Sequence, residues 1–234
     1  MSNLCHFCEK NLPLQNSHIV PKFLFQTLKG TKGHMVGING RGHHGSARLQ
    51  DGLKEHLFCH ACEQFFSAKY ERPYEQFWRK NDPLPNPWRG IEVKVKFDYG
   101  PFKLFHLLNL YRAAVSSLSS YRHVELGPHV GKLRGMLRSE NPGEAHLYQI
   151  SGSVILDQSG QLARLVTVPQ KRRYETRIAW ETCYGGVAWI IAISGGFPPA
   201  TTKAALQADG SMRLMALPMH HYSVMHVAAA LLNR

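Results

Sequence analysis

Aromatic residues recur at helical intervals in the segment that follows Cys59. They are spaced so that they share one face of a helix: Phe65, Phe66, Tyr70, Tyr74 and Phe77. The pattern predicts a helix that begins near Cys59. Residues 81–87 are rich in proline and cannot continue it, because proline lacks an N–H donor and clashes with the preceding turn. We therefore predict a boundary here, between a first domain at residues 1–80 and a second at residues 81–234.

The second domain alternates between short strand-like and helix-like patterns. Residues 91–97 alternate between apolar and polar positions, as a half-buried strand does. The apolar stretch at residues 102–121 predicts a helix, and residues 131–138 predict another. This order predicts a domain of mixed helices and antiparallel sheet, and an α+β fold for the whole chain. Further strands are predicted over residues 146–156, 163–168, 174–184, 187–193 and 212–217, and a last helix over residues 223–232.

Four of the five cysteines form two Cys-x-x-Cys pairs, Cys5 with Cys8 and Cys59 with Cys62. Each pair forms a knuckle that offers two thiolates to one tetrahedral ion, and soft sulfur ligands select zinc. Two unrelated pairs of buried thiols are the alternative, but free cysteines seldom cluster in this way. A four-thiolate site has no open coordination position, so the pattern predicts a structural zinc. Cys183 stands apart in an apolar run and is interpreted as an inert core thiol.

The chain is strongly basic: its 234 residues carry a formal charge of +12, with an isoelectric point near 9.7. This balance favours a polyanionic partner, because Lys and Arg that neutralise phosphates release counterions. A basic surface that serves only solubility is the other reading. No uninterrupted apolar run of about 18 residues predicts a membrane span, and the first residues lack the apolar core of a signal peptide. These features predict a cytoplasmic protein.

Residues 30–45 are rich in glycine, histidine and basic side chains. Glycine occurs too often here for a helix, so the segment is predicted to be a loop. The loop either closes over a phosphate backbone or is a solvated segment without a partner, and the sequence leaves both readings open. Its histidine and basic residues are His34, His43, His44, Lys32 and Arg41.

Two motifs accompany the cysteine pairs. Residues 16–23, after the first pair, read Asn-Ser-His-Ile-Val-Pro-Lys-Phe, and Glu63 follows the second pair directly. With these motifs, residues 4–72 resemble the HNH endonuclease superfamily in its zinc-stapled treble-clef (ββα-metal) form. More narrowly, they resemble a branch in which Ser-His-Ile-x-Pro replaces Asp-His-Ile-x-Pro and Cys-x-x-Cys-Glu replaces Cys-x-x-Cys-His. The resemblance implies an N-terminal treble-clef module ahead of the second domain.

The resemblance also implies a role for each motif residue. His18 occupies the position of the general base, and Glu63 that of a ligand to the catalytic divalent metal ion. Ser17 occupies the position of a second ligand, and Lys54 lies near that of an Asn that orients the base. A hydroxyl is a weak ligand, so either another group completes the site, or Glu63, waters and the substrate phosphate hold the ion. The candidates for that other group are Glu55, His56, Asp51 and Glu71.

The function implied by the resemblance is metal-dependent hydrolysis of phosphodiester bonds in DNA, with Mg²⁺ or Mn²⁺. Such hydrolysis needs a base for the attacking water and a metal ion at the leaving oxygen. HNH proteins of this design often serve bacterial defence against phage, which implies protein partners as well as DNA. The residues at positions 17, 54 and 63 differ from the usual family pattern. They support an alternative, in which a non-catalytic zinc module binds nucleic acid or a partner protein.

Overall fold

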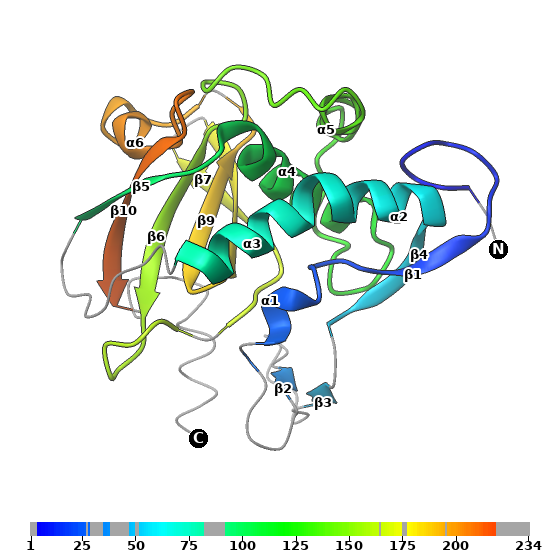
Figure 1. Cartoon of the computed structure of the whole chain (residues 1–234), viewed down its shortest axis with the longest axis horizontal. Coiled ribbons are helices and arrows are strands. Elements are labelled where there is room, and N and C mark those ends of the chain that lie inside the picture. The colour runs from blue at the N-terminus through cyan, green and yellow to red at the C-terminus, as the bar shows by residue number, and fades with distance from the viewer. Residues whose placement is uncertain are drawn as a thin grey trace.

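The structure, a computed structural model, describes residues 4–26, 28, 35–37, 47–49, 52–81, 92–163, 165–174, 177–194 and 196–218 (Figure 1). Several features predicted from the sequence lie outside these ranges: His34, His43 and His44 of the glycine-rich loop, the prolines of the boundary, and the helix over residues 223–232. Among the described residues, no helix is long and apolar enough to cross a membrane.

A pair of antiparallel strands and a long helix form the N-terminal part of the fold. Strand β1 (Leu14–His18) pairs with β4 (Lys54–Cys59). β4 runs directly into α2 (His60–Phe66), which continues through a π-helical turn, η1 (Ser67–Glu71), into α3 (Arg72–Asn81). The helix predicted to begin near Cys59 is therefore confirmed. Three shorter elements complete this part: α1 (Phe23–Gln26), β2 (Met35–Gly37) and β3 (Ala47–Leu49).

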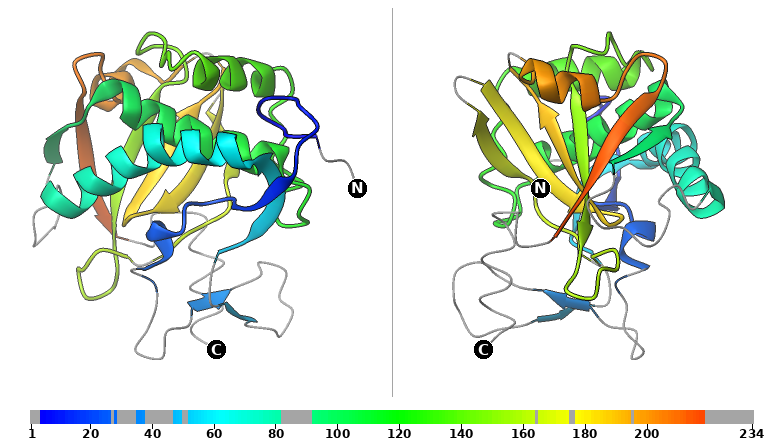
Figure 2. Two further views of the ribbon diagram at one scale, coloured as in Figure 1. Left: turned by 45° about the vertical axis from the view of Figure 1, so that its right-hand side comes forward. Right: turned by 90° about the vertical axis from the view of Figure 1, so that its left-hand side faces the viewer.

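A six-stranded sheet forms the other side of the molecule, and Figure 2 shows the long helix lying across one face of it. The prediction of an α+β fold is confirmed. Within the described residues, β10 runs parallel to β6 and all other neighbours in this sheet are antiparallel, so the sheet is mixed. In spatial order the strands are β5 (Glu92–Lys96), β10 (Ser211–Pro218), β6 (Ile150–Leu156), β9 (Val187–Ala192), β8 (Arg177–Tyr184) and β7 (Gln170–Tyr174).

The helices of the second part differ from the predicted ones at their ends. The helix predicted over residues 102–121 is present, but it begins and ends earlier than predicted: α4 spans Tyr99–Val115. It ends early where Ser116 adopts an extended backbone, with φ −74° and ψ 135°. The second predicted helix is present as α5 (His129–Arg138). A short helix before β10, α6 (Pro199–Ala204), is one that the apolar pattern did not predict.

Two strand predictions are corrected. Residues 163–168 form no strand in their described part, and they touch the sheet through isolated bonds such as Thr167 N–H to the Cys183 carbonyl at 3.0 Å. The strand predicted over residues 174–184 runs across two separate strands: it includes the last residue of β7 and all of β8. β7 was missed because Gln-Lys-Arg-Arg-Tyr lacks apolar alternation. It lies at the edge of the sheet, where charged side chains block pairing with other chains.

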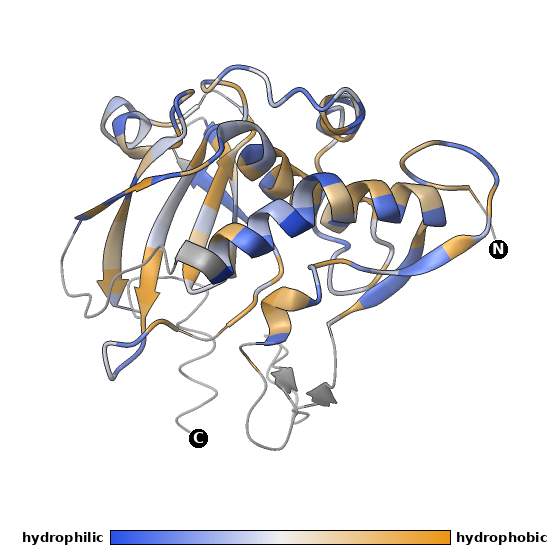
Figure 3. Cartoon of the chain, viewed as in Figure 1, coloured by the Kyte–Doolittle hydropathy of each residue, from blue (hydrophilic) through white to orange (hydrophobic). Residues whose placement is uncertain are grey.

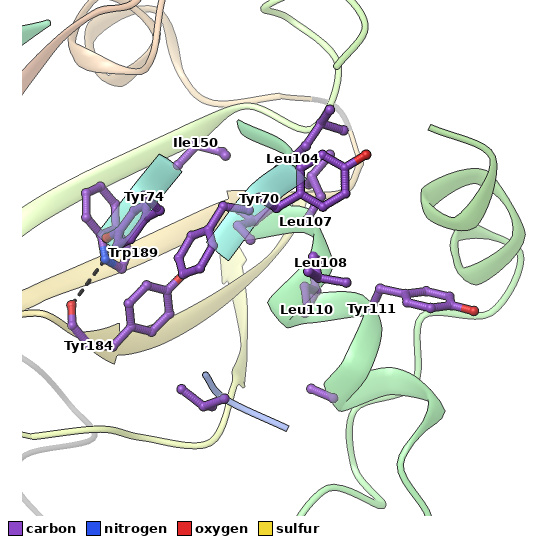
Figure 4. Close-up of a cluster of buried hydrophobic side chains, with 14 of the residues drawn as sticks. Tyr70, Tyr74, Leu104, Leu107, Leu108, Leu110, Tyr111, Ile150, Tyr184 and Trp189 are labelled. Atoms are coloured by element: carbon purple, nitrogen blue, oxygen red, sulfur yellow. Dashed lines mark hydrogen bonds between the residues drawn. The ribbon is translucent and has the colours of Figure 1, made fainter. Parts of the chain in front are cut away.

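Helix α4 occupies the centre of the apolar core. Every residue from 102 to 113 is buried, because α4 lies between α3 and the sheet. The ring of Tyr74 on α3 stacks on that of Phe105, with centroids 3.8 Å apart. On the sheet side, the Trp189 indole donates to the Tyr184 carbonyl at 3.3 Å (Figure 4). One hydrophobic cluster thus includes residues from both sides of the predicted boundary.

The long helix changes character along its length. Figure 3 shows mainly apolar residues in α2 and many hydrophilic residues in α3. Phe66 and Tyr70, at the end of α2 and in η1, are buried, and the Tyr70 hydroxyl donates to the Leu137 carbonyl of α5 at 2.7 Å. The beginning of the helix is therefore packed more closely than its end. This closely packed segment carries two residues of the site described below, Glu63 and Glu71.

Tyr111 connects α4 to the first cysteine pair, since its buried hydroxyl donates to the His6 carbonyl at 2.6 Å. A Tyr111→Phe substitution leaves that carbonyl without its donor, and we expect the free energy of unfolding to fall by about 1 kcal/mol. Denaturant titration followed by fluorescence measures this change. The matched control is Tyr74→Phe, which removes a buried hydroxyl that has no hydrogen-bond partner among the described residues and should cost less. Equal stability of Tyr111→Phe and the wild type would contradict the expectation.

Candidate functional site

The four cysteines of the two pairs come together beside β4. Cys59 ends β4, Cys62 lies in the first turn of α2, and Cys5 and Cys8 lie on the turn next to them. All four sulfur atoms lie within 4.8 Å of one another. The Sγ–Sγ separations are 3.4 Å for Cys59–Cys62, 3.7 Å for Cys5–Cys62 and 3.9 Å for Cys8–Cys59. The predicted grouping of these four residues is confirmed.

This cluster fits a tetrahedral zinc ion. Zinc–sulfur bonds of about 2.3 Å place tetrahedral ligands about 3.8 Å apart, close to the observed separations. Burial raises the pKa of the Cys5 thiol, but backbone N–H groups of Cys8, Cys59 and Phe7 outweigh burial and lower the pKa to about 7. Burial and contact with the other thiols raise the pKa of Cys62, because neighbouring thiolates repel until a cation neutralises them. The site can therefore hold a structural metal ion such as zinc.

A cleft of about 320 Å³ opens next to the cysteine cluster. Ser17 and His18 enter it from β1, Glu63 from α2, Glu71 from η1, and Arg112 from α4. The connection through β4 explains why strand and helix meet here, because β4 pairs with β1 and continues without a loop into α2. The cleft is completed by Gln15, Asn16, Pro21, Lys22, His60 and Gln64.

The two residues of the Ser-His motif lie at the end of β1. Ser17 is 3% exposed, and its hydroxyl donates to the Gln15 carbonyl at 3.3 Å. A bulge in the strand pairing lies between Gln15 and Asn16, directly before the motif. Such bulges re-aim the side chains next to them. His18 pairs with Lys54 in the strand register, so the residue near the family's Asn position lies on the adjacent strand.

A buried arginine holds both carboxylates of the cleft. The Arg112 Nη2 donates to Glu63 Oε2 at 3.3 Å, and Nη1 donates to Glu71 Oε1 at 2.5 Å. The second oxygen of Glu63, Oε1, is buried and has no hydrogen-bond partner. In a regular α-helix, residues eight positions apart differ by about 80° in direction. The π-helical turn rotates each residue by less, which brings Glu63 and Glu71 closer to one face.

Glu55 and His56, predicted as additional ligands, are not among the residues that line the cleft. The Glu55 carboxylate accepts bonds from the Ser116 hydroxyl at 2.6 Å and the Ser117 N–H at 3.0 Å, just after α4 ends. Burial raises the pKa of Glu55, but these hydrogen bonds outweigh burial and lower it. His56 is exposed, with Nδ1 3.2 Å from the Leu14 carbonyl oxygen. Both residues thus contact backbone or side chains away from the cleft.

Arg112 is the buried charged residue of the cleft that sequence reasoning missed; His60 and Gln64, which follow Cys59 and flank Glu63, were missed as well. Arg112 belongs to the apolar stretch that predicted α4, where polar residues recur every third position: Lys103, His106, Asn109 and Arg112. All four are buried. Charged residues are almost never fully buried unless they are paired. A basic residue inside so apolar a helix was therefore a signal of acidic partners elsewhere in the chain.

The cleft is lined by two imidazoles (His18 and His60), the two carboxylates, the Arg112 guanidinium and the exposed ammonium group of Lys22. Arg112 neutralises one of the two carboxylate charges, so the group of Arg112, Glu63 and Glu71 retains a net negative charge, and exposed Lys22 is a second cation of the lining. Among the described residues, only the four cysteines bring three or more His, Cys, Asp or Glu ligand atoms together. An ion in the cleft would therefore complete its shell with water or substrate, as Mg²⁺ commonly does. Asp51, another candidate ligand, lies outside the described ranges.

Comparisons of the chain with protein-family models, with curated proteins and with solved structures found no match. The function is therefore inferred from the thiolate site, from the cleft and from the motifs that form them.

Purified protein should contain about one tightly bound zinc ion per chain, because four thiolates close one tetrahedral site. Elemental analysis combined with thiol titration measures this. Cys59→Ala should lose the ion, whereas Cys183→Ala, which removes a buried thiol outside the cluster, should retain it. Chelation should accelerate hydrogen exchange in the N-terminal part more than in the sheet, because the binding energy of the ion is folding energy. Folded, zinc-free protein with four freely titrating thiols would contradict the site.

Proposed function

We propose that this chain is a metal-dependent endonuclease of the HNH type that hydrolyses phosphodiester bonds in DNA. One observation carries the proposal: His18 and Glu63, to which the motifs give the roles of base and metal ligand, line one cleft next to a four-thiolate site. A lone histidine or a lone carboxylate in a cleft is a weak indication of catalysis. Mutual geometry between a base and a metal ligand is a stronger one.

The residues of the cleft suit the two requirements of this reaction. His18 is the general base, since an imidazole accepts a proton from water near neutral pH. Glu63 is the ligand for Mg²⁺ or Mn²⁺ through Oε1, the oxygen that Arg112 does not bind. When bound, such an ion stabilises the negative charge that develops on the leaving oxygen. Ser17 is too weak a donor to replace a carboxylate.

The charge of the chain supports a nucleic-acid substrate. The formal charge of +12 favours binding to phosphate backbones. Lys22 is exposed and lines the cleft, where its ammonium group would contact a phosphate next to the scissile bond. Contacts of this kind position the backbone without reading sequence. Affinity for DNA should accordingly fall steeply as salt rises.

A second candidate function is a non-catalytic zinc module that binds nucleic acid or a partner protein. The ion pair between Arg112 and Glu63 favours it, because a carboxylate that is already neutralised attracts a metal ion less strongly. The two candidates differ in what they do to DNA. The first cuts a supercoiled plasmid in the presence of Mg²⁺ or Mn²⁺, and the second only retards it in a gel.

We expect His18→Ala and Glu63→Gln to lose plasmid cleavage while they retain zinc, thermal stability and DNA affinity. A general base or metal ligand acts chiefly on the transition state, and loss of a general base lowers the rate about 10²- to 10⁴-fold. Gel-based nicking assays with Mg²⁺ and Mn²⁺ measure the rates. His56→Ala and Glu92→Gln are matched controls, because both residues lie outside the cleft and should leave the rate unchanged.

Two results would overturn the assignment in different ways. If the wild type cuts DNA and His18→Ala cuts it equally well, His18 has a structural role and the general base is another group. If the zinc-loaded wild type binds DNA but does not nick it with either metal, the non-catalytic module is the better description.

A further inference from the structure

Arg112 lies at an unusual place for a charged residue, near the end of the most buried helix of the fold. Its side chain is 1% exposed. The guanidinium carbon lies 5.3 Å from the centre of the Phe66 ring, which provides a cation–π contact. This packing fixes the plane of the guanidinium before any ligand arrives. α4 thus delivers a rigid cationic group from the second part of the chain to a cleft built by the first.

The hydrogen bonds of Arg112 divide its charge between two carboxylates. Nη2 binds Glu63 and Nη1 binds Glu71, so each carboxylate is held by a different arm of one planar fork. Without this group, the two carboxylates of the cleft would face each other with no shared counter-charge. With it, Glu63 Oε2 is occupied while Oε1 has no hydrogen-bond partner. The guanidinium therefore decides which oxygen of Glu63 is left without a hydrogen-bond partner.

A lysine could not do the same at this position. Arginine presents donors in a rigid plane, whereas lysine is a point charge on a flexible stem. An ammonium group in place of Arg112 would keep the charge of the cleft. It would not hold Glu63 and Glu71 at fixed angles at the same time. The arrangement thus depends on the geometry of the fork as well as on its charge.

We infer that Arg112, anchored by Glu71, is the positioning residue that orients Glu63 for the catalytic metal ion. The inference rests on the proposed function, because it concerns how the same cleft holds its cation. Arg112 acts through Glu63 and does not itself contact the reacting atoms. Hydrogen-bonded partners of this kind orient metal ligands, and their loss commonly costs 10- to 100-fold in metal affinity or activity.

The test is an Arg112→Lys variant of the full, zinc-loaded chain. Electron paramagnetic resonance measures the binding of Mn²⁺ directly, and plasmid nicking measures the rate as Mn²⁺ is varied. We expect Mn²⁺ to bind about tenfold more weakly and nicking at a fixed Mn²⁺ concentration to slow 10- to 100-fold. DNA affinity and zinc content should stay within twofold of the wild type. The matched control is Arg134→Lys, since Arg134 pairs with Glu9 outside the cleft.

Glu71→Gln provides a second variant in case Arg112→Lys does not fold. The amide oxygen still accepts a bond from Nη1, but the anchoring charge is lost and the guanidinium is drawn towards Glu63 alone. We expect weaker Mn²⁺ binding together with a lower melting temperature, because buried Arg112 loses one of its two counter-charges. A role of the Arg112–Glu71 pair in packing alone would lower the melting temperature and leave Mn²⁺ binding by the folded variant unchanged.

Failure of this inference differs from failure of the proposed function. If the wild type binds Mn²⁺ and cuts DNA, and the folded variants of Arg112 and Glu71 do both equally well, the positioning role is wrong and the nuclease assignment stands. If the wild type neither binds Mn²⁺ in addition to its zinc nor cuts DNA, the proposed function is wrong and the positioning role falls with it.

Discussion

The fold of the N-terminal part is built around four thiols that lie close enough together to hold one metal ion. A structural zinc site of this kind contributes about 10–16 kcal/mol, as much as the whole stability of a typical domain. Such an ion would join the thiols of Cys5 and Cys8 to those of Cys59 and Cys62 at the junction of β4 and α2. That junction sets the position of α2 relative to β1. A bound ion would therefore fix the distance between the strand that carries His18 and the helix that carries Glu63, and a four-thiolate site has no open coordination position for chemistry of its own.

The second constraint is the contact of α4 with the cleft. Aromatic packing holds the helix in place: the Tyr74 ring of α3 stacks on Phe105, and the Trp189 ring of β9 contacts Phe102. The burial of Arg112 is tolerable only because Glu63 and Glu71 accept its charge. Packing and ion pairing thus support each other. The described part of the chain after residue 91 supplies the sheet and one residue of the cleft lining, the buried cation Arg112.

The local features of the chain were predictable from sequence, and the contacts between distant segments were not. Cysteine spacing and aromatic periodicity are local, so they predicted the thiolate cluster and the start of α2. The position of Glu55 depends on its hydrogen bonds with Ser116 and Ser117. The position of Arg112 depends on the carboxylates of Glu63 and Glu71, which lie far from it in the sequence. No local pattern encodes such contacts. The π-helical turn likewise depends on contacts between distant segments, so no local pattern predicted it. β7 forms a strand although its charged sequence lacks apolar alternation, because its place at the edge of the sheet matters more than its local pattern.

The central claim is that the cleft binds a divalent cation through Glu63. The most direct measurement is anomalous diffraction from crystals of the zinc-loaded protein bound to a DNA duplex and soaked in Mn²⁺. The account predicts a zinc peak among the four cysteines and a separate Mn²⁺ peak in contact with Glu63 Oε1 and a DNA phosphate, next to His18. A zinc peak with DNA in the cleft and no Mn²⁺ peak beside Glu63 would contradict it.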